Sequence, residues 1–143
     1  MRGIREHFVL KRAAIVGLLL VPVAGCGGNT RQAIEGSVTL DGQPLQDGSI
    51  QFRPIEGTEG PTAGAEVLNG QFSIHRDDGP LPGIYRVEIT AMGKTQGKLP
   101  PKLARQWGEY TQILPTRYNT ESQLRAEVAA GGPNQFEFAV TSQ

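Results

Sequence analysis

The sequence predicts an all-β fold, a sandwich of seven short strands preceded by an N-terminal signal helix. Glycine (19 residues) and proline (10 residues) are abundant in a chain of 143 residues, which is typical of a β-domain with many turns. From Ile34 onward, apolar residues recur at every second position, the period of a β-strand. Each run is apolar on one face only, and such strands bury that face against a second sheet. The size is that of one immunoglobulin-like domain.

The N-terminal region has the three parts of a secretory signal peptide. A basic segment ends at Arg12, an apolar segment runs from Ala13 to Ala24, and small residues follow it. The apolar segment has about twelve residues, too few to span roughly 30 Å of hydrocarbon as a helix. A transmembrane anchor is therefore the weaker interpretation.

The single cysteine of the chain directly follows this apolar segment. The sequence Val23-Ala24-Gly25-Cys26 resembles a bacterial lipobox, and a lone cysteine cannot form an internal disulfide. The resemblance implies that signal peptidase II recognises Val23, Ala24 and Gly25 and removes residues 1–25, and that Cys26 carries lipid. Two or three acyl chains, at ~0.8 kcal/mol per buried methylene, would anchor the protein stably. The alternative is an ordinary signal peptide with an incidental cysteine.

The residues after Cys26 predict a tether and weakly favour one membrane. Residues 26–33 are mostly small and polar, as in a flexible linker to a domain at 34–143. Residue 27 is glycine, whereas an aspartate there retains lipoproteins in the inner membrane of some bacteria. We therefore expect an exported protein anchored to the cell envelope, with the outer membrane favoured over the inner one.

The first four strands are predicted from alternation and turn residues. Asp41-Gly42 and Asp47-Gly48 indicate turns, Asn69-Gly70 indicates a two-residue hairpin, and Pro54 is expected to end its strand. The predicted strands are residues 34–40, 49–54, 63–68 and 71–74.

The last three strands flank a long insertion. Residues 84–91 show the clearest alternation, with Tyr85, Val87, Ile89 and Ala91 on one side. The other two strands are predicted at 124–128 and 136–140, joined by a turn rich in glycine.

The insertion, at about 92–120, is expected to be irregular apart from a short helix after Pro100 that ends at Gly108. Trp107, Tyr110 and Tyr118 in this stretch are candidate contacts for a partner protein or a glycan, because aromatic residues on loops often anchor such interfaces. The alternative is that Leu103 and Trp107 cap the core.

Two motifs carry a family resemblance. The sequences of residues 81–87 and 69–74, LPGIYRV and NGQFSI, resemble signatures of carboxypeptidase regulatory-like domains. Such domains have a transthyretin-like β-sandwich, and the likeness covers about residues 34–91. The chain is also similar to short bacterial lipoproteins of unknown role. For this type of fold, we expect Gly83 to clear space for Tyr85, whose hydroxyl should bond a loop carbonyl as in a tyrosine corner.

The residue inventory argues against several functions. Residues 26–143 hold one histidine, His75, expected to be solvated, whereas a catalytic zinc commonly needs two histidines among three ligands. Hydroxyisourate hydrolases of the transthyretin-like fold need further histidines, and no Gly-x-Ser-x-Gly motif is present. Calcium binding by Asp77 and Asp78, with Asp41 or Asp47, is less expected than ordinary turn chemistry.

Charge excludes nucleic acid as an expected partner. Residues 1–25 contain four of the 14 basic residues and one of the 14 acidic residues, which leaves 10 basic and 13 acidic residues in the remainder. An acidic domain without a basic cluster lacks the positive surface that binds nucleic acid.

These observations together predict a function without catalysis. We expect a non-enzymatic, cofactor-free envelope protein, attached to the membrane through Cys26, with a structural or protein-interaction role. A carbohydrate-binding module is the alternative, and an enzyme with an unrecognised site is less expected.

Overall fold

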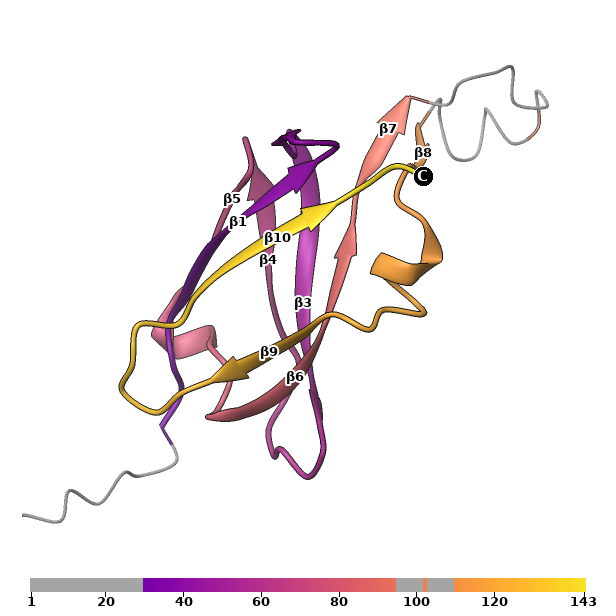
Figure 1. The fold of residues 1–143 in the computed structure, drawn as a ribbon. Coiled ribbons are helices and arrows are strands. Elements are labelled where there is room, and N and C mark those ends of the chain that lie inside the picture. The colour runs from indigo at the N-terminus through magenta and orange to yellow at the C-terminus, as the bar shows by residue number, and fades with distance from the viewer. Residues whose placement is uncertain (1–29, 95–101, 103–109) are drawn as a thin grey trace, which may run out of the picture.

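The structure, a computed structural model, describes residues 30–94, 102 and 110–143 and confirms the all-β prediction (Figure 1). Its strands are β1 (Ile34–Leu40), β2 (Gln43–Pro44), β3 (Asp47–Ile55), β4 (Ala63–Leu68), β5 (Gln71–Ile74), β6 (Gly83–Thr90), β7 (Met92–Lys94), β8 (Tyr110–Gln112), β9 (Arg125–Val128) and β10 (Gln135–Val140). Two single 3-10 turns, η1 (Arg76–Asp78) and η2 (Thr116–Tyr118), complete the regular structure of the described part. The short strands β2, β7 and β8 are additional to the seven predicted.

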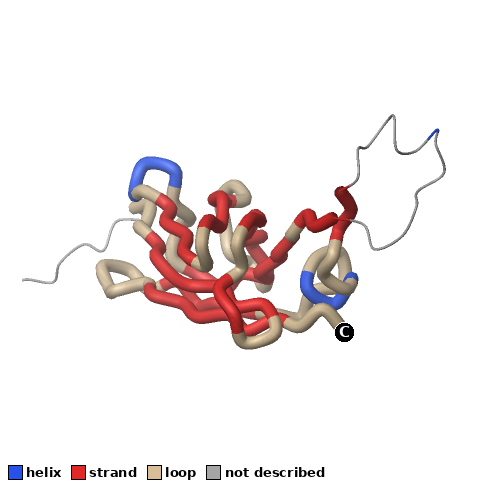
Figure 2. Tube along the Cα trace, turned by 90° about the horizontal axis from the view of Figure 1, so that it is seen from above, coloured by secondary structure: helices blue, strands red, loops and turns tan. Residues whose placement is uncertain are grey.

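One curled, mostly antiparallel sheet contains eight of these strands, in the order β10-β1-β5-β4-β3-β6-β9, with β2 beside β1. Only β1 and β10 pair in parallel. A single Cα pair, Leu68 with Gln71, joins β4 to β5, whereas β3 and β6 share seven pairs. The pairing of β4 with β5 is therefore the narrowest described in this sheet, and Figure 2 shows strands that curve rather than lie in one flat layer.

The core lies inside the curl and draws apolar side chains from both halves of the sheet. Phe52 on β3 lies within 6.5 Å, between ring centroids, of three phenylalanines on β5 and β10. Gly36 on β1 makes room for this cluster. A Cβ atom at position 36 would lie 2.6 Å from the ring of Phe72 and 2.1 Å from the carbonyl oxygen of Phe136. The apolar residues of these strands therefore point into the core, as the two-residue period of the sequence predicted.

The turns follow the predictions in two cases out of three. Asp41-Gly42 and Asn69-Gly70 both have positive φ at each residue, as a two-residue hairpin of this kind requires. Asp47-Gly48, by contrast, begins β3 and makes no turn. A Cβ atom at Gly48 would lie 2.5 Å from the carbonyl oxygen of Thr90, so the glycine permits close strand packing.

Pro54 does not end its strand, contrary to the prediction. β3 continues to Ile55, and Pro54 pairs with Tyr85 on β6. The pairing of β3 with β4 stops at Phe52, so beyond that residue β3 has a neighbour on one side only. A proline is tolerated at such a local edge because its missing N–H removes no ladder hydrogen bond there.

Tyr85 behaves as expected, but the expected role of Gly83 is wrong. The Tyr85 ring is fully buried, and its hydroxyl donates to the Leu81 carbonyl at 2.8 Å. Burial raises the pKa of this hydroxyl. The space at Gly83 is taken by Thr58 rather than by Tyr85: a Cβ atom there would lie 2.4 Å from the Thr58 methyl carbon. The Thr58 hydroxyl accepts from the Ile84 N–H at 2.8 Å.

A separate two-stranded ribbon extends the sheet at one end. β7 and β8 pair antiparallel across the stretch that the sequence suggested was irregular. The Gln112 side-chain carbonyl accepts from the N–H groups of Ala91 and Leu114 and so fastens the base of the ribbon. The predicted helix after Pro100 lies outside the described residues, apart from Lys102, which is exposed.

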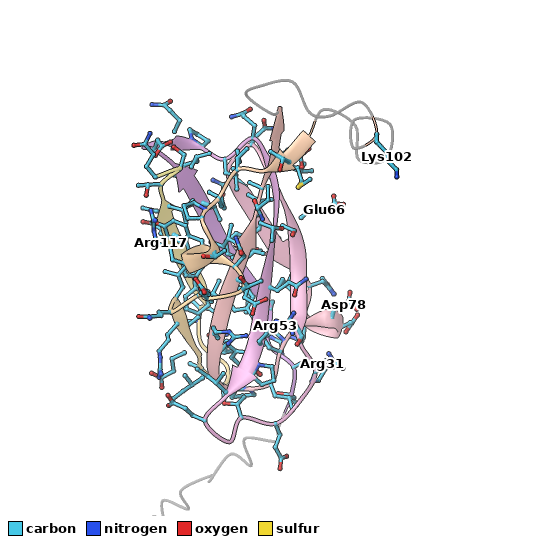
Figure 3. All side chains as sticks on the ribbon, turned by 90° about the vertical axis from the view of Figure 1, so that its right-hand side faces the viewer. Arg31, Arg53, Glu66, Asp78, Lys102 and Arg117 are labelled. Carbon is cyan, nitrogen blue, oxygen red and sulfur yellow. The ribbon has the colours of Figure 1, made fainter. Side chains whose placement is uncertain are left out.

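The chain enters the body at the opposite end, where two residues before β1 are fixed. Gln32 is 2 % exposed, its N–H donates to the Pro80 carbonyl at 2.8 Å, and its side-chain oxygen accepts from the Gly131 N–H at 2.9 Å. Arg31 donates to the Gly79 carbonyl at 3.0 Å. In Figure 3, Arg31 lies in the half of the body where the chain enters, and Lys102 lies at the other end. Among the described residues, none forms a helix that could cross a membrane.

Candidate functional site

The residues predicted for lipidation and processing, Val23, Ala24, Gly25 and Cys26, lie outside the described residues. Trp107 does so as well, and of Tyr110 the structure describes only that its backbone belongs to β8. These four processing residues and the two aromatic residues stay predictions from the sequence.

Tyr118 lies in η2, half-buried against the core. Its hydroxyl is 3.1 Å from the Thr141 hydroxyl, and the Arg117 guanidinium carbon is 4.8 Å from the ring centroid. The hydrogen bond with Thr141 is the main cause that holds the pKa of Tyr118 below its usual value. Tyr118 thus packs on the C-terminal segment and has a structural role in the described part of the chain.

The aspartates considered for calcium are not brought together. Asp41, just after β1, accepts from the N–H and the hydroxyl of Ser142, and these bonds lower its pKa. Asp77 and Asp78 lie in η1, at the other end of β1, since Ile34 pairs with Ile74. His75 caps η1 and its side chain is 79 % exposed, as expected for a solvated residue. The described residues contain no group of three metal-ligating side chains.

A row of three arginines crosses the outer face of β3, β6 and β9. Arg53 pairs with Arg86 in the β3–β6 register, and Arg86 pairs with Arg125 in the β6–β9 register. All three point away from the core, because they alternate with buried neighbours such as Phe52, Val87 and Ala126. We call this outer surface the arginine face. Figure 3 shows Arg53 in the half of the body where the chain enters.

Two glutamates hold the row. Glu88 accepts from Arg53 Nε at 2.7 Å and from Arg86 Nη2 at 2.6 Å, and Glu56 pairs with Arg125. Burial alone would raise the pKa of Glu88, whose side chain is 13 % exposed. The hydrogen bonds and charges of the two arginines outweigh burial, so the pKa of this carboxyl lies below its usual value.

The described residues use only part of the hydrogen-bonding capacity of Arg86, the middle arginine of the row. Arg86 Nε is buried and has no hydrogen-bond partner among the described residues. Beside it lies a surface hollow of about 420 Å³, lined by Ile55, Glu56, Arg86, Ser122, Gln123 and Arg125. Guanidinium groups at the wall of a hollow can bind anions, because they carry positive charge and several N–H donors.

The outer face of β5, β1 and β10 has the opposite character. Glu35 on β1 and Glu137 on β10 lie beside a hollow of about 480 Å³, whose other lining residues include Ser37, Gln71 and Gln135. Neither glutamate forms an ion pair within 4.0 Å in the described part of the chain. We call this surface the carboxylate face.

Sequence reasoning missed the arginine row. Alternation places Arg86 outward on its strand, but only the register of β3, β6 and β9 aligns it with Arg53 and Arg125. These three residues are 33 and 39 positions apart in the sequence. The available signal was that three of the seven predicted strands, 49–54, 84–91 and 124–128, each carry an outward arginine.

No family model, no curated protein and no solved structure matches this chain.

Proposed function

We propose that this chain is a non-enzymatic, lipid-anchored protein of a bacterial cell envelope, with a structural or protein-interaction role. The observation that carries the proposal is the sequence Val23-Ala24-Gly25-Cys26, after a basic segment and an apolar segment, in a chain with no other cysteine. The proposed attachment is a thioether between Cys26 and a diacylglyceryl group. Confinement to a surface would raise the effective concentration of the domain toward its neighbours.

The entry of the chain into the body supports a defined orientation. Arg31 and Gln32 are held by the segments around Gly79 and Gly131. Five residue steps separate Cys26 from Arg31, and an extended chain covers at most about 18 Å over that length. The end of the body that carries η1 would therefore lie next to the bilayer, and the β7–β8 ribbon would point away from it.

For the finer fold we propose a sandwich of the carboxypeptidase regulatory-like, transthyretin-like type. Its two layers would be β10-β1-β5 and β4-β3-β6-β9, joined by the single pair between β4 and β5. The bond from the Tyr85 hydroxyl to the Leu81 carbonyl supports this proposal, since a buried tyrosine bonded to an upstream carbonyl is the corner of such folds.

The lipid proposal is tested by labelling in bacterial cells. Wild-type protein and the Cys26→Ser variant are expressed with an alkyne-bearing palmitate analogue, and the purified chains are analysed by intact-mass and N-terminal mass spectrometry. We expect label on the wild type only, and an N-terminus at Cys26. Recovery of a wild-type chain that retains residues 1–25 and a free thiol would contradict the proposal.

The interaction role is tested by crosslinking in intact cells. A recurrent crosslinked protein, captured with wild type and lost with Cys26→Ser, would support a role that depends on position at the membrane. Capture of envelope glycan alone would instead favour the carbohydrate-binding alternative and overturn the protein-interaction role.

A further inference from the structure

We propose that the hollow between Arg86 and Arg125 binds a single oxyanion, a carboxylate or a phosphate group. This inference goes beyond the proposed function and does not depend on lipid attachment. It assigns chemistry to the arginine face, for which no family resemblance suggests a role.

The first argument is charge. Three arginines stand directly opposite one another on adjacent strands, an arrangement in which like charges repel. Glu88 and Glu56, the two glutamates that pair with the row, supply two negative charges. Glu127 also points outward from β9, but among the described residues it neither pairs with the row nor lines the hollow. The hollow itself is lined by two arginines and one carboxylate, so it keeps the excess positive charge of the row. An oxyanion in the hollow would balance the third arginine.

The second argument is the set of donors at the hollow. Arg86 donates from Nη2 to Glu88, and its Nε, which has no acceptor among the described residues, is buried, so the donors that Arg86 can offer to the hollow are its other Nη hydrogens. Arg125 donates from Nη1 to Glu56. Each guanidinium has five N–H donors in a planar fork, so both retain donors for an incoming carboxylate or phosphate. The exposed amide of Gln123 lies on the same wall.

The third argument is competition within the hollow. Glu56 is the only carboxylate among the residues that line it, and Glu56 is paired with Arg125. Glu88 pairs with the row but does not line the hollow. Glu56 therefore acts as an internal competitor for Arg125, and its removal should strengthen anion binding.

The test is a titration of the full chain in an uncharged maltoside detergent at low salt. The probes are inorganic phosphate and galacturonate, and galactose is the neutral control. Binding is followed by the ¹⁵N–¹H signals of the arginine Nε groups. We expect a saturable shift of the Arg86 signal with at least one anion and none with galactose. Phosphate alone would identify phosphate-bearing ligands, galacturonate alone carboxylate-bearing ones, and both outcomes support the site.

Three variants distinguish binding in this hollow from a general effect of the charge of the protein. Arg125→Gln, at a side chain that is 62 % exposed, should weaken binding by about tenfold, the factor expected for one charge-assisted hydrogen bond. Glu56→Gln should strengthen it. Arg76→Gln, an exposed arginine in η1, removes the same charge elsewhere and should leave affinity unchanged. Absence of saturable shifts with both anions, or equal weakening by Arg76→Gln and Arg125→Gln, would overturn the inference.

Discussion

The arginine face and the carboxylate face are built from the same alternating pattern but differ in how their charges are arranged. On the arginine face, Glu88 bridges two arginines, and Glu56 pairs with the third. On the carboxylate face, Glu35 and Glu137 border a hollow without an ion pair within 4.0 Å among the described residues. The comparison teaches that alternation decides which residues point outward, whereas strand order and register decide which of them meet.

The two faces also rest on different supports. Beneath the carboxylate face, Gly36 leaves room for Phe72 and the backbone of Phe136. Next to the arginine face, Tyr85 is hydrogen-bonded to Leu81 and buried. We therefore expect packing to dominate the stability of the first region, and polar contacts to contribute more to the second.

The largest expected effect is at Gly36. Gly36→Ala forces a Cβ atom against the backbone oxygen of Phe136, which cannot move as a side-chain end can. Overpacking of this kind should lower the free energy of unfolding by about 3 kcal/mol. Chemical denaturation measures the loss. Gly132→Ala, where an added Cβ meets only the Ala129 methyl carbon at 3.4 Å, is the control and should change stability by less than about 0.5 kcal/mol. Equal effects of the two variants would contradict this role of Gly36.

Tyr85→Phe should have the next largest effect. The variant keeps the buried ring but leaves the Leu81 carbonyl without its donor. We expect a loss of about 1 to 2 kcal/mol in the free energy of unfolding, as for a partly buried acceptor left unsatisfied. Tyr118→Phe is a matched control, because its hydroxyl bond to Thr141 is exposed to solvent. A larger loss for Tyr118→Phe would show that the Tyr85 corner contributes little.

Glu88→Gln and Glu137→Gln compare the two faces directly, since each removes one carboxylate charge. Glu88 accepts hydrogen bonds from two arginines, so its neutralisation should lower the free energy of unfolding by about 1 kcal/mol. Glu137 is exposed and forms no ion pair among the described residues. Its substitution should therefore change the free energy of unfolding by less than about 0.5 kcal/mol. Thermal unfolding of both variants checks this, and equal costs would contradict the distinction between the faces.

The smallest effect should be a pH dependence of the Glu88 contribution. Because the pKa of Glu88 is lower in the folded chain than its usual value of 4.5, its stabilising effect is present above pH 4.5 and is lost as pH falls through the folded value. The stability difference between wild type and Glu88→Gln should therefore shrink on acidification from pH 5 to pH 3. A difference that stays constant over this range would show that the arginines do not lower that pKa.

The inward-facing residues could be predicted from the sequence because burial imposes a two-residue period on each strand. Tyr85, Val87 and Ile89 are all fully buried, as the alternation indicated. The Asn69-Gly70 turn was likewise predictable, since its positive φ angles favour those residue types.

The errors came from contacts between distant segments. Pro54 stays in its strand because β4 stops pairing at Phe52, and Gly48 serves close packing rather than a turn. The arginine row needs the pairing of three strands that are far apart in the sequence. Local patterns contain none of this information, so these features emerged only from the structure.

The fastening of residues 31 and 32 just before β1 has a mechanical consequence. A pull on the N-terminal side of the chain would enter β1 along its length, and β1 is bonded to β10 on one side and to β5 on the other. Ladder bonds run across the strand direction, so such a load shears many of them together rather than opening them one at a time. We expect the domain to resist a force applied through its proposed anchor more strongly than a force applied across the strands.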